Sequence, residues 1–409
     1  MLRLGIQVIA ETLLAVVFLL VTGAWASTET VIYSFSGYDG YMPESPVGLD
    51  SSGNVYGMTT SGGAYGIGNV YQLVNTSGTW TWNDLYDFTG GKDGALPIFS
   101  GVVMDSSGNL YGTTLAGGAH QSGVVFELAA SRGTWTEKVL YSFKGGKDAD
   151  GPYASLAIDS RGNLYGTTTF GGGDSGGCFP RGCGTVFELT KTGRSWKETI
   201  LHVFKNNGVD GVHPWYQVTL DKSGTLYGTT YEGGAVGNGV VFRLTKPTKG
   251  NVWKETILHS FTGYADGCLP SSGLILDGSG NLYGTTGSCG KSYGGTVYQL
   301  RPSGQKYTNK TILQFDGAEG LYPYDYGILA MDKAGNIYGS ASSGGANNAG
   351  TVFKLSAGSW GYSDLHDFDF NGDGLYPYSG ITLDSAGDLY GTTANGGSDG
   401  YGIVYQITP

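Results

Sequence analysis

The chain has 409 residues, a net charge of −11 and no run of basic residues. Such an acidic protein gains nothing from releasing counterions from phosphates, which argues against nucleic acid and anionic membranes as partners. Glycine accounts for 74 residues, but 29 tyrosines and 16 phenylalanines supply a core, so the chain is not of the disordered class.

Residues 1–26 have the pattern of a secretory signal peptide. Arg3 precedes an apolar run over residues 13–22, and residues 24–26 (Ala-Trp-Ala) form a small-x-small cleavage site. The apolar run is short for a membrane span of about 20 residues. We therefore predict a cleaved signal rather than an uncleaved anchor, a mature chain that begins at Ser27, and no membrane insertion after cleavage.

One motif, Asn-Leu-Tyr-Gly-Thr-Thr in its cleanest form, recurs seven times after that signal. The spacings between successive motif tyrosines are 55, 54, 62, 56, 55 and 52 residues. The tyrosines are Tyr56, Tyr111, Tyr165, Tyr227, Tyr283, Tyr338 and Tyr390. A repeat of this length that contains several short strands indicates a propeller or a solenoid.

The second repeat shows how the strands are arranged. Residues 101–105 predict strand A, residues 109–114 strand B, residues 124–128 strand C and residues 139–143 strand D, because each is rich in β-branched or aromatic residues and is bounded by turn residues. Four strands joined by hairpins make one antiparallel propeller blade, with strand D outermost. Residues 27–409 therefore form a single repeat domain.

Aromatic residues recur in strands C and D of every repeat, and we expect them to fill the space between blades. Strand C carries Tyr71, Phe126, Phe187, Phe242, Tyr298, Phe353 and Tyr405. Strand D ends in Phe35, Phe88, Phe143, Phe204, Phe261, Phe315 and Phe368.

The two ends of the chain decide between a ring and a solenoid. Residues 31–35 have the pattern of a strand D, and residues 403–407 that of a strand C, so the seventh blade lacks an outer strand. A linear solenoid would leave both ends unpaired. We therefore predict an all-β, seven-bladed β-propeller of four-stranded antiparallel blades, in which the N-terminal strand completes the last blade.

The repeat also resembles a known family. The pattern Asp-x-x-Gly-Asn-Leu-Tyr-Gly-Thr-Thr, then Gly-Gly, then Gly-x-Val-Phe-x-Leu is similar to the bacterial GloVer repeat of choice-of-anchor tandem repeat GloVer-containing proteins. The resemblance covers residues 31–407 and recurs seven times. It implies an exported bacterial protein of propeller type, and it brings no established catalytic residues.

Four cysteines are an even number for an exported protein. Cys178 and Cys183 share one loop, whereas Cys268 precedes strand A of the fifth repeat and Cys289 follows its strand B, ends that antiparallel pairing brings together. We predict the disulfides Cys178–Cys183 and Cys268–Cys289. A zinc site is the alternative, but the paired C-x₂-C spacing is missing.

The loops from strand D to the next strand A (D–A loops) and from strand B to strand C (B–C loops) leave the same end of every blade. They form a rim around the central channel. The D–A loops carry Asp-Gly-x-x-Pro, whose acids either bind cations or serve turn chemistry, and sevenfold repetition favours turns. The acids are Asp39, Asp93, Asp150, Asp210, Asp266, Glu319 and Asp373.

Residues that do not repeat are better candidates for a functional site. We predict that the rim binds a ligand through His213, Trp215, Tyr216, Tyr324, Asp325, Tyr326 and Tyr378, with Glu44, Ile98 and Tyr153 in the same set. Aromatic rings beside polar groups stack on sugars or hold a partner protein. The alternative is that these rings pack between the tops of the blades. His202, His259 and His366 occupy the strand-D place of Tyr33, Tyr86 and Tyr141, so we interpret them as structural.

One D–A loop matches the start of a calcium loop. Asp369, Asn371 and Asp373 alternate before a glycine and offer hard oxygen ligands that suit Ca²⁺. The position of the final glutamate of an EF-hand is Gly380, so the match is partial. Calcium is the one cofactor that the sequence suggests.

These features favour an exported, monomeric binding or scaffold module whose partner is carbohydrate or a cell-surface protein. The alternative is an enzyme on the same rim: a carbohydrate hydrolase or lyase, or a calcium-dependent lactonase. It would use Glu44, His213, Asp325 or the loop from Asp369 to Asp373. No Ser-His-Asp set, metal-binding histidine pair or phosphate loop stands out in the sequence, which leans against an enzyme.

Overall fold

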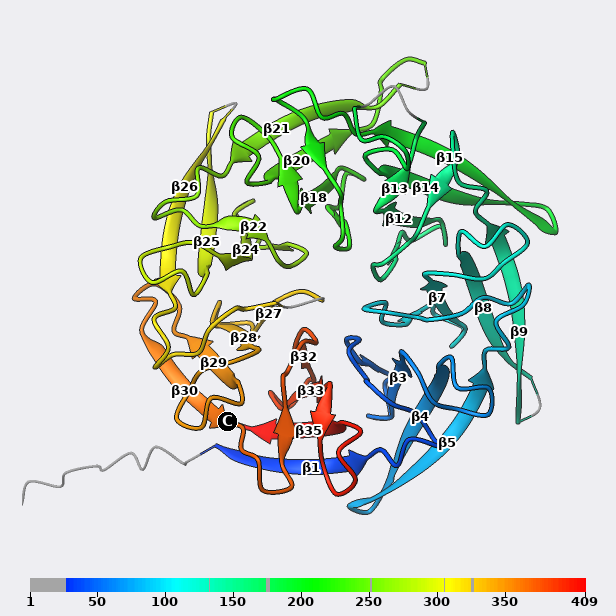
Figure 1. Ribbon diagram of the computed structural model, residues 1–409, viewed down its shortest axis with the longest axis vertical. Helices are drawn as coiled ribbons and strands as arrows, with labels where there is room; N and C mark the ends of the chain where they lie inside the picture. Colours follow the sequence, from blue (N-terminus) through cyan, green and yellow to red (C-terminus); the bar gives the residue numbers. More distant parts are fainter. Residues whose placement is uncertain (1–26, 132, 174–176, 251, 305, 325–326) are drawn as a thin grey trace, which may run out of the picture.

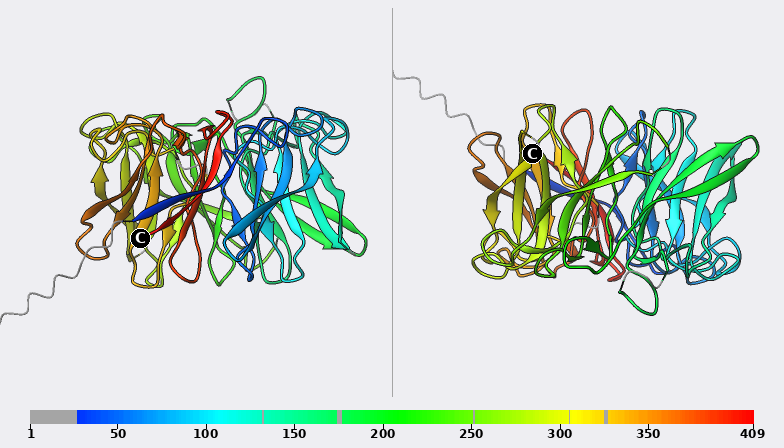
Figure 2. Two further views of the ribbon diagram at one scale, coloured as in Figure 1. Left: turned by 90° about the horizontal axis from the view of Figure 1, so that it is seen from below. Right: turned by 90° about the horizontal axis from the view of Figure 1, so that it is seen from above.

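A computed structural model describes residues 27–131, 133–173, 177–250, 252–304, 306–324 and 327–409. These residues form seven antiparallel sheets arranged as blades around a central axis (Figure 1). In the side views the strands run between the two ends of the ring, and the loops gather at both ends (Figure 2). The predicted seven-bladed propeller is confirmed, and the expected signal peptide lies outside the described residues.

Successive strands of each blade step outward from the axis (Figure 1). The A strands are β2 (Gly48–Leu49), β6 (Val103–Met104), β11 (Ala157–Ile158), β17 (Thr219–Leu220), β23 (Ile275–Leu276), β27 (Ala330–Met331) and β32 (Thr382–Leu383). The B strands are β3 (Val55–Thr59), β7 (Leu110–Thr114), β12 (Leu164–Thr168), β18 (Leu226–Thr230), β24 (Leu282–Ser288), β28 (Ile337–Ala341) and β33 (Leu389–Thr393). The C strands are β4 (Asn69–Thr76), β8 (Val124–Ser131), β14 (Thr185–Thr192), β20 (Val240–Thr245), β25 (Thr296–Ser303), β29 (Thr351–Leu355) and β35 (Ile403–Thr408). The D strands are β5 (Thr79–Asp87), β9 (Thr134–Ser142), β15 (Ser195–Val203), β21 (Lys254–Ser260), β26 (Lys306–Gln314), β30 (Tyr362–Asp367) and β1 (Thr28–Ser34).

In four blades, short strands at the rim pair the D–A loop with the B–C loop of the blade it enters, and single bridges do so in the other three. The paired strands are β10 (Ala149–Asp150) with β13 (Phe170–Gly171), β16 (Gly211–Val212) with β19 (Glu232–Gly233), β31 (Gly374–Leu375) with β34 (Asn395–Gly396), and β22 (Cys268–Pro270) with the end of β24. The rim is therefore a hydrogen-bonded layer rather than a set of separate loops.

The first strand of the described chain closes the ring. β1 pairs antiparallel with β35, from Thr28 opposite Thr408 to Ser34 opposite Ile403, and completes the sheet β1-β35-β33-β32. This pairing confirms the predicted closure. It leaves neither terminal blade with an open outer edge, the hazard that an unclosed array would carry.

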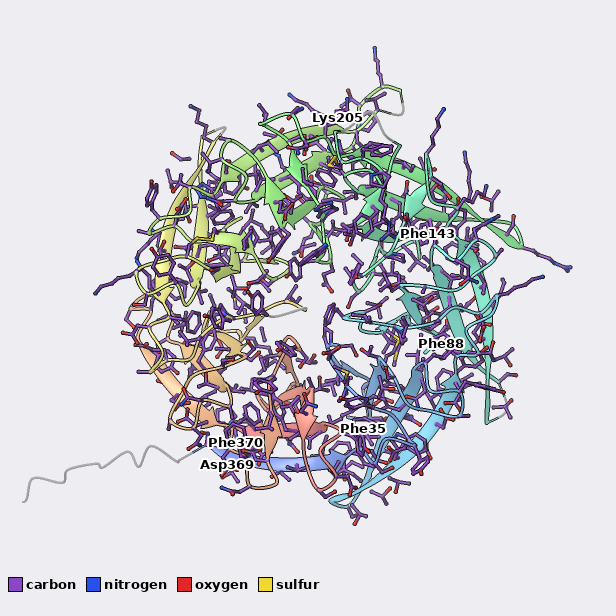
Figure 3. All side chains as sticks on the ribbon, in the orientation of Figure 1. Phe35, Phe88, Phe143, Lys205, Asp369 and Phe370 are labelled. Atoms are coloured by element: carbon purple, nitrogen blue, oxygen red, sulfur yellow. A yellow bond between two sulfur atoms is a disulfide. The ribbon has the colours of Figure 1, made fainter. Side chains whose placement is uncertain are left out.

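Neighbouring blades meet through pairs of aromatic rings. The phenylalanine at the end of each outer strand contacts the strand-C ring of the next blade edge to face, with centroids 5.0–5.5 Å apart. The pairs are Phe35–Tyr71, Phe88–Phe126, Phe143–Phe187, Phe204–Phe242, Phe261–Tyr298, Phe315–Phe353 and Phe368–Tyr405. All are fully buried, as predicted, and Figure 3 shows Phe35, Phe88 and Phe143 within the ring wall.

The repeated motif is explained by local contacts. Its glycine makes room for the strand-C ring, because a Cβ at Gly112 would lie 2.6 Å from the ring of Phe126. Its tyrosine donates a hydrogen bond to the aspartate that ends strand A, at 3.0 Å for Tyr56 and Asp50. Burial alone raises the pKa of Asp50, but hydrogen bonds from Asn54, the turn backbone and Tyr56 outweigh it and hold the pKa below its usual value.

A proline–glycine contact joins each D–A loop to the preceding blade. The residue before the loop proline has a positive φ in every copy, and six of the seven are not glycine: Met42, Leu96, His213, Leu269, Tyr322 and Tyr376, at 55–60°. The His213 N–H donates to the Cys183 carbonyl of the preceding blade, and the His213 carbonyl accepts from the Tyr231 N–H. The next proline packs on a glycine: a Cβ at Gly239 would lie 2.4 Å from Cδ of Pro270. These contacts support the interpretation of Asp-Gly-x-x-Pro as turn chemistry.

The predicted disulfides Cys178–Cys183 and Cys268–Cys289 are both present, and no cysteine is free. The alternative of a zinc site built from these cysteines is therefore wrong. The two bonds indicate an oxidising compartment outside the cytoplasm. Within the described part of the chain, no helix has the length and hydropathy needed to cross a membrane.

On the outer wall, several neighbouring D strands contact one another, as β5 and β9 do. A Tyr or His near the end of each of six D strands bonds to an acid of the D–A loop. The bonds are Tyr33–Asp39, Tyr86–Asp93, Tyr141–Asp148, His202–Asp210, His259–Asp266 and His366–Asp373. The three histidines thus take the same place in their junctions as the strand-D tyrosines, as the sequence predicted. The assignment of Asp150 to this set is wrong: Asp148 takes that place, and Asp150 pairs with Arg181 at 3.1 Å.

A glutamate from the next D strand reaches four of these junctions, as Glu137 does beside Tyr86 and Asp93. Among the described residues, no group donates a hydrogen bond to its buried Oε1. Burial, together with the smaller effect of the Asp93 charge, raises the pKa of Glu137 to about 7. The folded state therefore holds this proton more tightly than the unfolded chain does.

We predict that the contact between Gly239 and Pro270 is essential for stability. Gly239→Ala should lower the free energy of unfolding by about 3 kcal/mol, because the Cβ clashes with Pro270 and φ is +90°. Gly224→Ala is the matched control, since φ is +82° there but nothing lies within 4 Å, and it should cost about 1 kcal/mol. Urea denaturation of both variants checks this, and equal losses would contradict the packing argument.

We also predict that Glu137 makes stability depend on pH. The stabilisation from its bound proton is complete below its ordinary pKa of 4.5 and is lost as the pH rises through about 7. Glu137→Gln should leave the melting temperature unchanged at pH 4 and raise it by about 1–2 °C at pH 8, after allowance for solvent screening. Calorimetry at both pH values tests this. A variant that melts below the wild type at pH 8 would refute it.

Candidate functional site

Aromatic side chains line up along the rim on the side of the third and fourth blades. Trp215 stacks on Tyr231 with centroids 4.0 Å apart and planes inclined by 18°. The ring centroid of Tyr153 lies 6.3 Å from that of Trp215, and the centroid of Phe99 lies 6.1 Å from that of Tyr153. All four side chains are partly exposed. They form one row of near-parallel rings at the channel mouth.

A second group of rings extends this row over the sixth and seventh blades. Tyr324 stacks with Tyr322 at 6.0 Å, and Tyr378 stacks with Tyr376 at 6.2 Å. Gly287 leaves room for Tyr324, because a Cβ there would lie 2.3 Å from the tyrosine ring. The residue after the loop proline is thus aromatic in four blades, namely Tyr153, Trp215, Tyr324 and Tyr378.

The two groups are neighbours. Burial raises the pKa of Tyr324, and the nearby hydroxyls of Tyr231, Tyr322 and Tyr378 raise it further. Burial likewise raises the pKa of Tyr378, with Glu44 as the next contributor. We name the whole row the aromatic arc, which comprises Phe99, Tyr153, Trp215, Tyr231, Tyr324 and Tyr378.

Glu44 lies at one end of the aromatic arc. Its side chain is buried, and the Thr60 hydroxyl donates a hydrogen bond to Oε2 at 3.1 Å. Burial raises the pKa of Glu44 to about 7, although the hydrogen bond from Thr60 lowers it. Glu44 is therefore a carboxyl group that titrates near neutral pH beside the rim aromatics.

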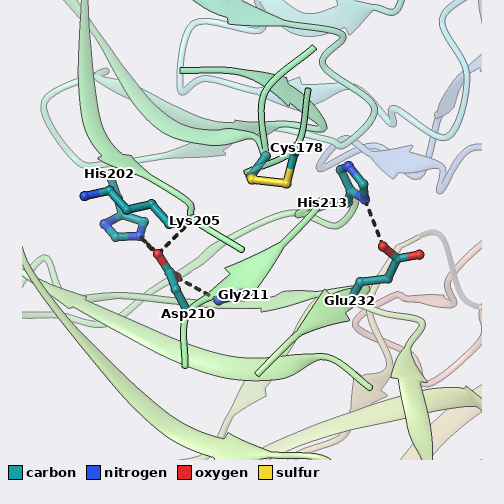
Figure 4. The surroundings of a disulfide bond; sticks show 8 residues. Cys178, His202, Lys205, Asp210, Gly211, His213 and Glu232 are labelled. Atoms are coloured by element: carbon teal, nitrogen blue, oxygen red, sulfur yellow. Dashed lines mark hydrogen bonds and ion pairs between the residues drawn. A yellow bond between two sulfur atoms is a disulfide. The ribbon is translucent and has the colours of Figure 1, made fainter. Parts of the chain in front are cut away.

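Charged side chains lie next to Tyr153 and Trp215. His213 Nδ1 is 3.3 Å from Glu232 Oε2 (Figure 4). The Arg181 guanidinium lies 3.8 Å from the ring centroid of Phe170 and pairs with Asp150. The disulfide Cys178–Cys183 encloses Arg181 in a closed loop. The aromatic arc is therefore bordered here by groups that can donate and accept hydrogen bonds.

Of the predicted rim residues that the structure describes, Tyr216 and Ile98 are not part of the aromatic arc, whereas Glu44 and His213 lie beside it. Tyr216 is only 1% exposed, and its contact with a ligand stays a prediction. Trp215, its neighbour in the chain, is partly exposed, so the two adjacent rings differ in burial. Asp325 and Tyr326 lie outside the described residues.

The three residues of the calcium loop are engaged in other bonds. Asp369 accepts hydrogen bonds from the backbone N–H and the side chain of Asn371. Asp373 pairs with His366 at 2.8 Å and accepts from the Gly374 N–H at 2.6 Å. Asp373 is thus used in an outer-wall junction, and calcium binding by Asp369, Asn371 and Asp373 stays a prediction.

Sequence reasoning missed several members of the site. Tyr231 comes directly after the repeated motif, where the other copies have different residues, so comparing that position across repeats would have found it. Phe99 follows Ile98 in a D–A segment that is one residue longer than most. Arg181 and Glu232 carry no sequence signal, because only folding brings them beside Phe170 and His213.

A cavity of about 1050 Å³ occupies the channel. Its wall is formed mainly by apolar side chains of the A strands, among them Val47, Val103, Leu276, Met331 and Leu383. Polar groups enter the lining at Gln217 and at the A–B turns that follow β17 and β23. The polar and aromatic chemistry is thus concentrated at the rim rather than in the channel.

The fold and the repeats define a class: a closed β-propeller assembled from tandem blades of one sequence pattern. The model of the Gloeobacter/Verrucomicrobia repeat matches residues 15–181 and 175–405. The chain therefore belongs to the Gloeobacter/Verrucomicrobia (GloVer) repeat family, as the resemblance implied. No curated protein matches it in sequence.

Several solved structures have a similar fold. A provisionally assigned 6-phosphogluconolactonase from Bacteroides uniformis is 14% identical, covers 87% of this chain and 98% of its own, and has a TM-score of 0.54. A provisionally assigned oxidoreductase (glucose dehydrogenase) from Thermus thermophilus is 12% identical, with 94% and 100% covered and a TM-score of 0.44. A protein of unknown function from Dyadobacter fermentans is 11% identical, with 93% and 99% covered and a TM-score of 0.46. The first similarity shows the fold alone, and nothing is concluded from the other two, whose TM-scores are below 0.5.

Proposed function

We propose that this protein is an exported binding module that holds carbohydrate on the aromatic arc. The observation that supports this most is the row of partly exposed, near-parallel rings from Phe99 through Trp215 to Tyr231. Such rings offer flat apolar faces on which the C–H faces of sugar rings stack. A row of them suits a polymer better than a single small molecule.

The groups beside the aromatic arc suit the same ligand. His213, Glu232, Arg181 and Asp150 offer donors and acceptors for sugar hydroxyls next to Tyr153 and Trp215. A few polar groups around an apolar platform fix the orientation of a ligand. The loops that carry these side chains are held by the proline–glycine contacts and by a disulfide, so little ordering cost remains for binding.

The proposed location is extracellular or periplasmic, and the proposed state is monomeric. The two disulfides support export. The expected signal peptide at residues 1–26 points the same way. A cell-surface protein is the other partner that the aromatic arc suits, and the binding experiment below distinguishes the two.

A second candidate is a carbohydrate hydrolase or lyase on the same rim. It is favoured by Glu44, whose raised pKa of about 7 suits a general acid at neutral pH. The alternative of a calcium-dependent lactonase depends on the loop from Asp369 to Asp373, whose acids are engaged in other bonds, so we do not develop it.

We predict that the mature chain binds an insoluble polysaccharide and that Trp215→Ala weakens this binding at least about tenfold, because the central ring of the row is lost. Tyr38→Ala is the matched control, since Tyr38 is 92% exposed in a D–A loop outside the aromatic arc. Sedimentation with a panel of bacterial and plant polysaccharides measures both. Equal retention of the two variants would rule out the aromatic arc as the binding site. If the wild type binds no polysaccharide, the partner is instead a cell-surface protein.

We further predict that no reducing sugar is released in the same tubes. If the second candidate is correct, the wild type releases sugar, its activity falls as Glu44 loses its proton above pH 7, and Glu44→Gln lowers the rate at least about a hundredfold. Sugar release that is unchanged in Glu44→Gln would rule out Glu44 as the acid.

A further inference from the structure

The junction between the third and fourth blades gathers three side chains that suit a metal ion. His202 ends the outer strand β15, Asp210 lies in the following D–A loop, and Glu255 begins the outer strand β21. One ligand atom from each lies within 4.8 Å of the other two. An imidazole nitrogen with carboxylate oxygens is a donor set that suits zinc.

The distances are long for hydrogen bonds, and they also fit coordination of a shared metal ion. His202 Nε2 is 3.3 Å from Asp210 Oδ2 and 3.4 Å from Glu255 Oε1. A single N–H cannot point well at both carboxylates, and both distances exceed the usual range for N–H···O. Donor atoms about 2.0–2.1 Å from a tetrahedral zinc ion lie about 3.3–3.4 Å from one another. The nitrogen thus faces both oxygens at the spacing that a shared zinc ion would require.

On one side of the cluster, hydrogen bonds hold the Asp210 carboxylate in place, and on the other side the cluster faces a cavity. Asp210 is 6% exposed, and the backbone N–H groups of Lys205 and Gly211 donate to its carboxylate (Figure 4). A cavity of about 440 Å³ lies against His202, Asp210 and Glu255 and gives an entry path. Lys205 also lines this cavity, but it is exposed on the outer wall and free to turn into solvent (Figure 3).

Other junctions of the ring lack either the histidine or the glutamate of this cluster, so they can be compared with it. Tyr141 takes the place of the histidine beside Asp148 and Glu198. Asn309 takes the place of the glutamate beside His259 and Asp266. The ring therefore closes without a full ligand set at these positions.

A second full set, Glu29 with His366 and Asp373, lies between the sixth and seventh blades. There the nitrogen and the Asp373 oxygen are 2.8 Å apart, the distance of a direct hydrogen bond.

We propose that the junction of His202, Asp210 and Glu255 binds a zinc ion on the outer wall, with a fourth position open to the adjacent cavity. The ion would join two blades in place of the direct bond between a side chain and an acid at the other junctions. This site is separate from the aromatic arc and does not depend on the proposed carbohydrate binding.

Zinc titration of the EDTA-treated mature protein tests the proposal. His366→Tyr serves as the background, so that the second set does not contribute. We expect one zinc ion per chain by elemental analysis after dialysis, and a melting temperature about 3 °C higher at a zinc concentration a hundredfold above Kd. Adding His202→Tyr or Glu255→Asn should remove the bound zinc and the thermal shift, and both changes copy residues that other junctions already accommodate.

His259→Tyr in the same background is the matched control, because it alters a His–Asp pair that lacks the glutamate. It should leave zinc content and the thermal shift unchanged. The proposal is overturned if the background protein retains no zinc, or if His202→Tyr and Glu255→Asn retain as much zinc as His259→Tyr does.

Discussion

The antiparallel pairing of β1 with β35 is the contact on which the rest of the ring depends. Every blade buries apolar side chains on both faces, so an open array would expose one strand-C ring at one end and one strand-D phenylalanine at the other. Closure places Phe35 against Tyr71, which repeats the edge-to-face contact found between all other blades. The hydrophobic gain of seven equivalent interfaces is available only when the last blade takes its outer strand from the start of the chain.

Closure also fixes the rim, because each D–A loop is held between two blades. The positive φ before each loop proline and the glycine beneath that proline recur around the ring, so the loop backbone has one geometry. Side chains that follow the proline are free to differ, and they range from Glu44 to Trp215. A repeated backbone with unrepeated side chains is an economical way to build a binding surface on a rigid scaffold.

The junctions on the outer wall likewise repeat one backbone arrangement with side chains that differ between blades. At six of the seven junctions a loop acid is bonded by a tyrosine or a histidine of the preceding D strand. Where a glutamate joins from the next blade, a second carboxyl enters the same small volume, as at Glu137 and Glu255. Such a pair must hold a proton or a cation, since two buried carboxylates cannot both stay charged without a partner.

The sequence by itself determined the strand order, the seven blades, the closing strand, both disulfides and the strand-D place of the histidines, because these follow from local turn chemistry and from a pattern copied seven times. Only the tertiary structure decided which rim residues form a surface. In the folded chain Tyr216 is buried, whereas Trp215 is partly exposed and stacks on Tyr231. In the D–A loop that enters the third blade, the acid that bonds to Tyr141 is Asp148 instead of Asp150. His202 and Glu255 are 53 residues apart and meet only where two blades touch. Contacts of this kind depend on how neighbouring sheets twist and pack, and no pattern within a single repeat records that geometry.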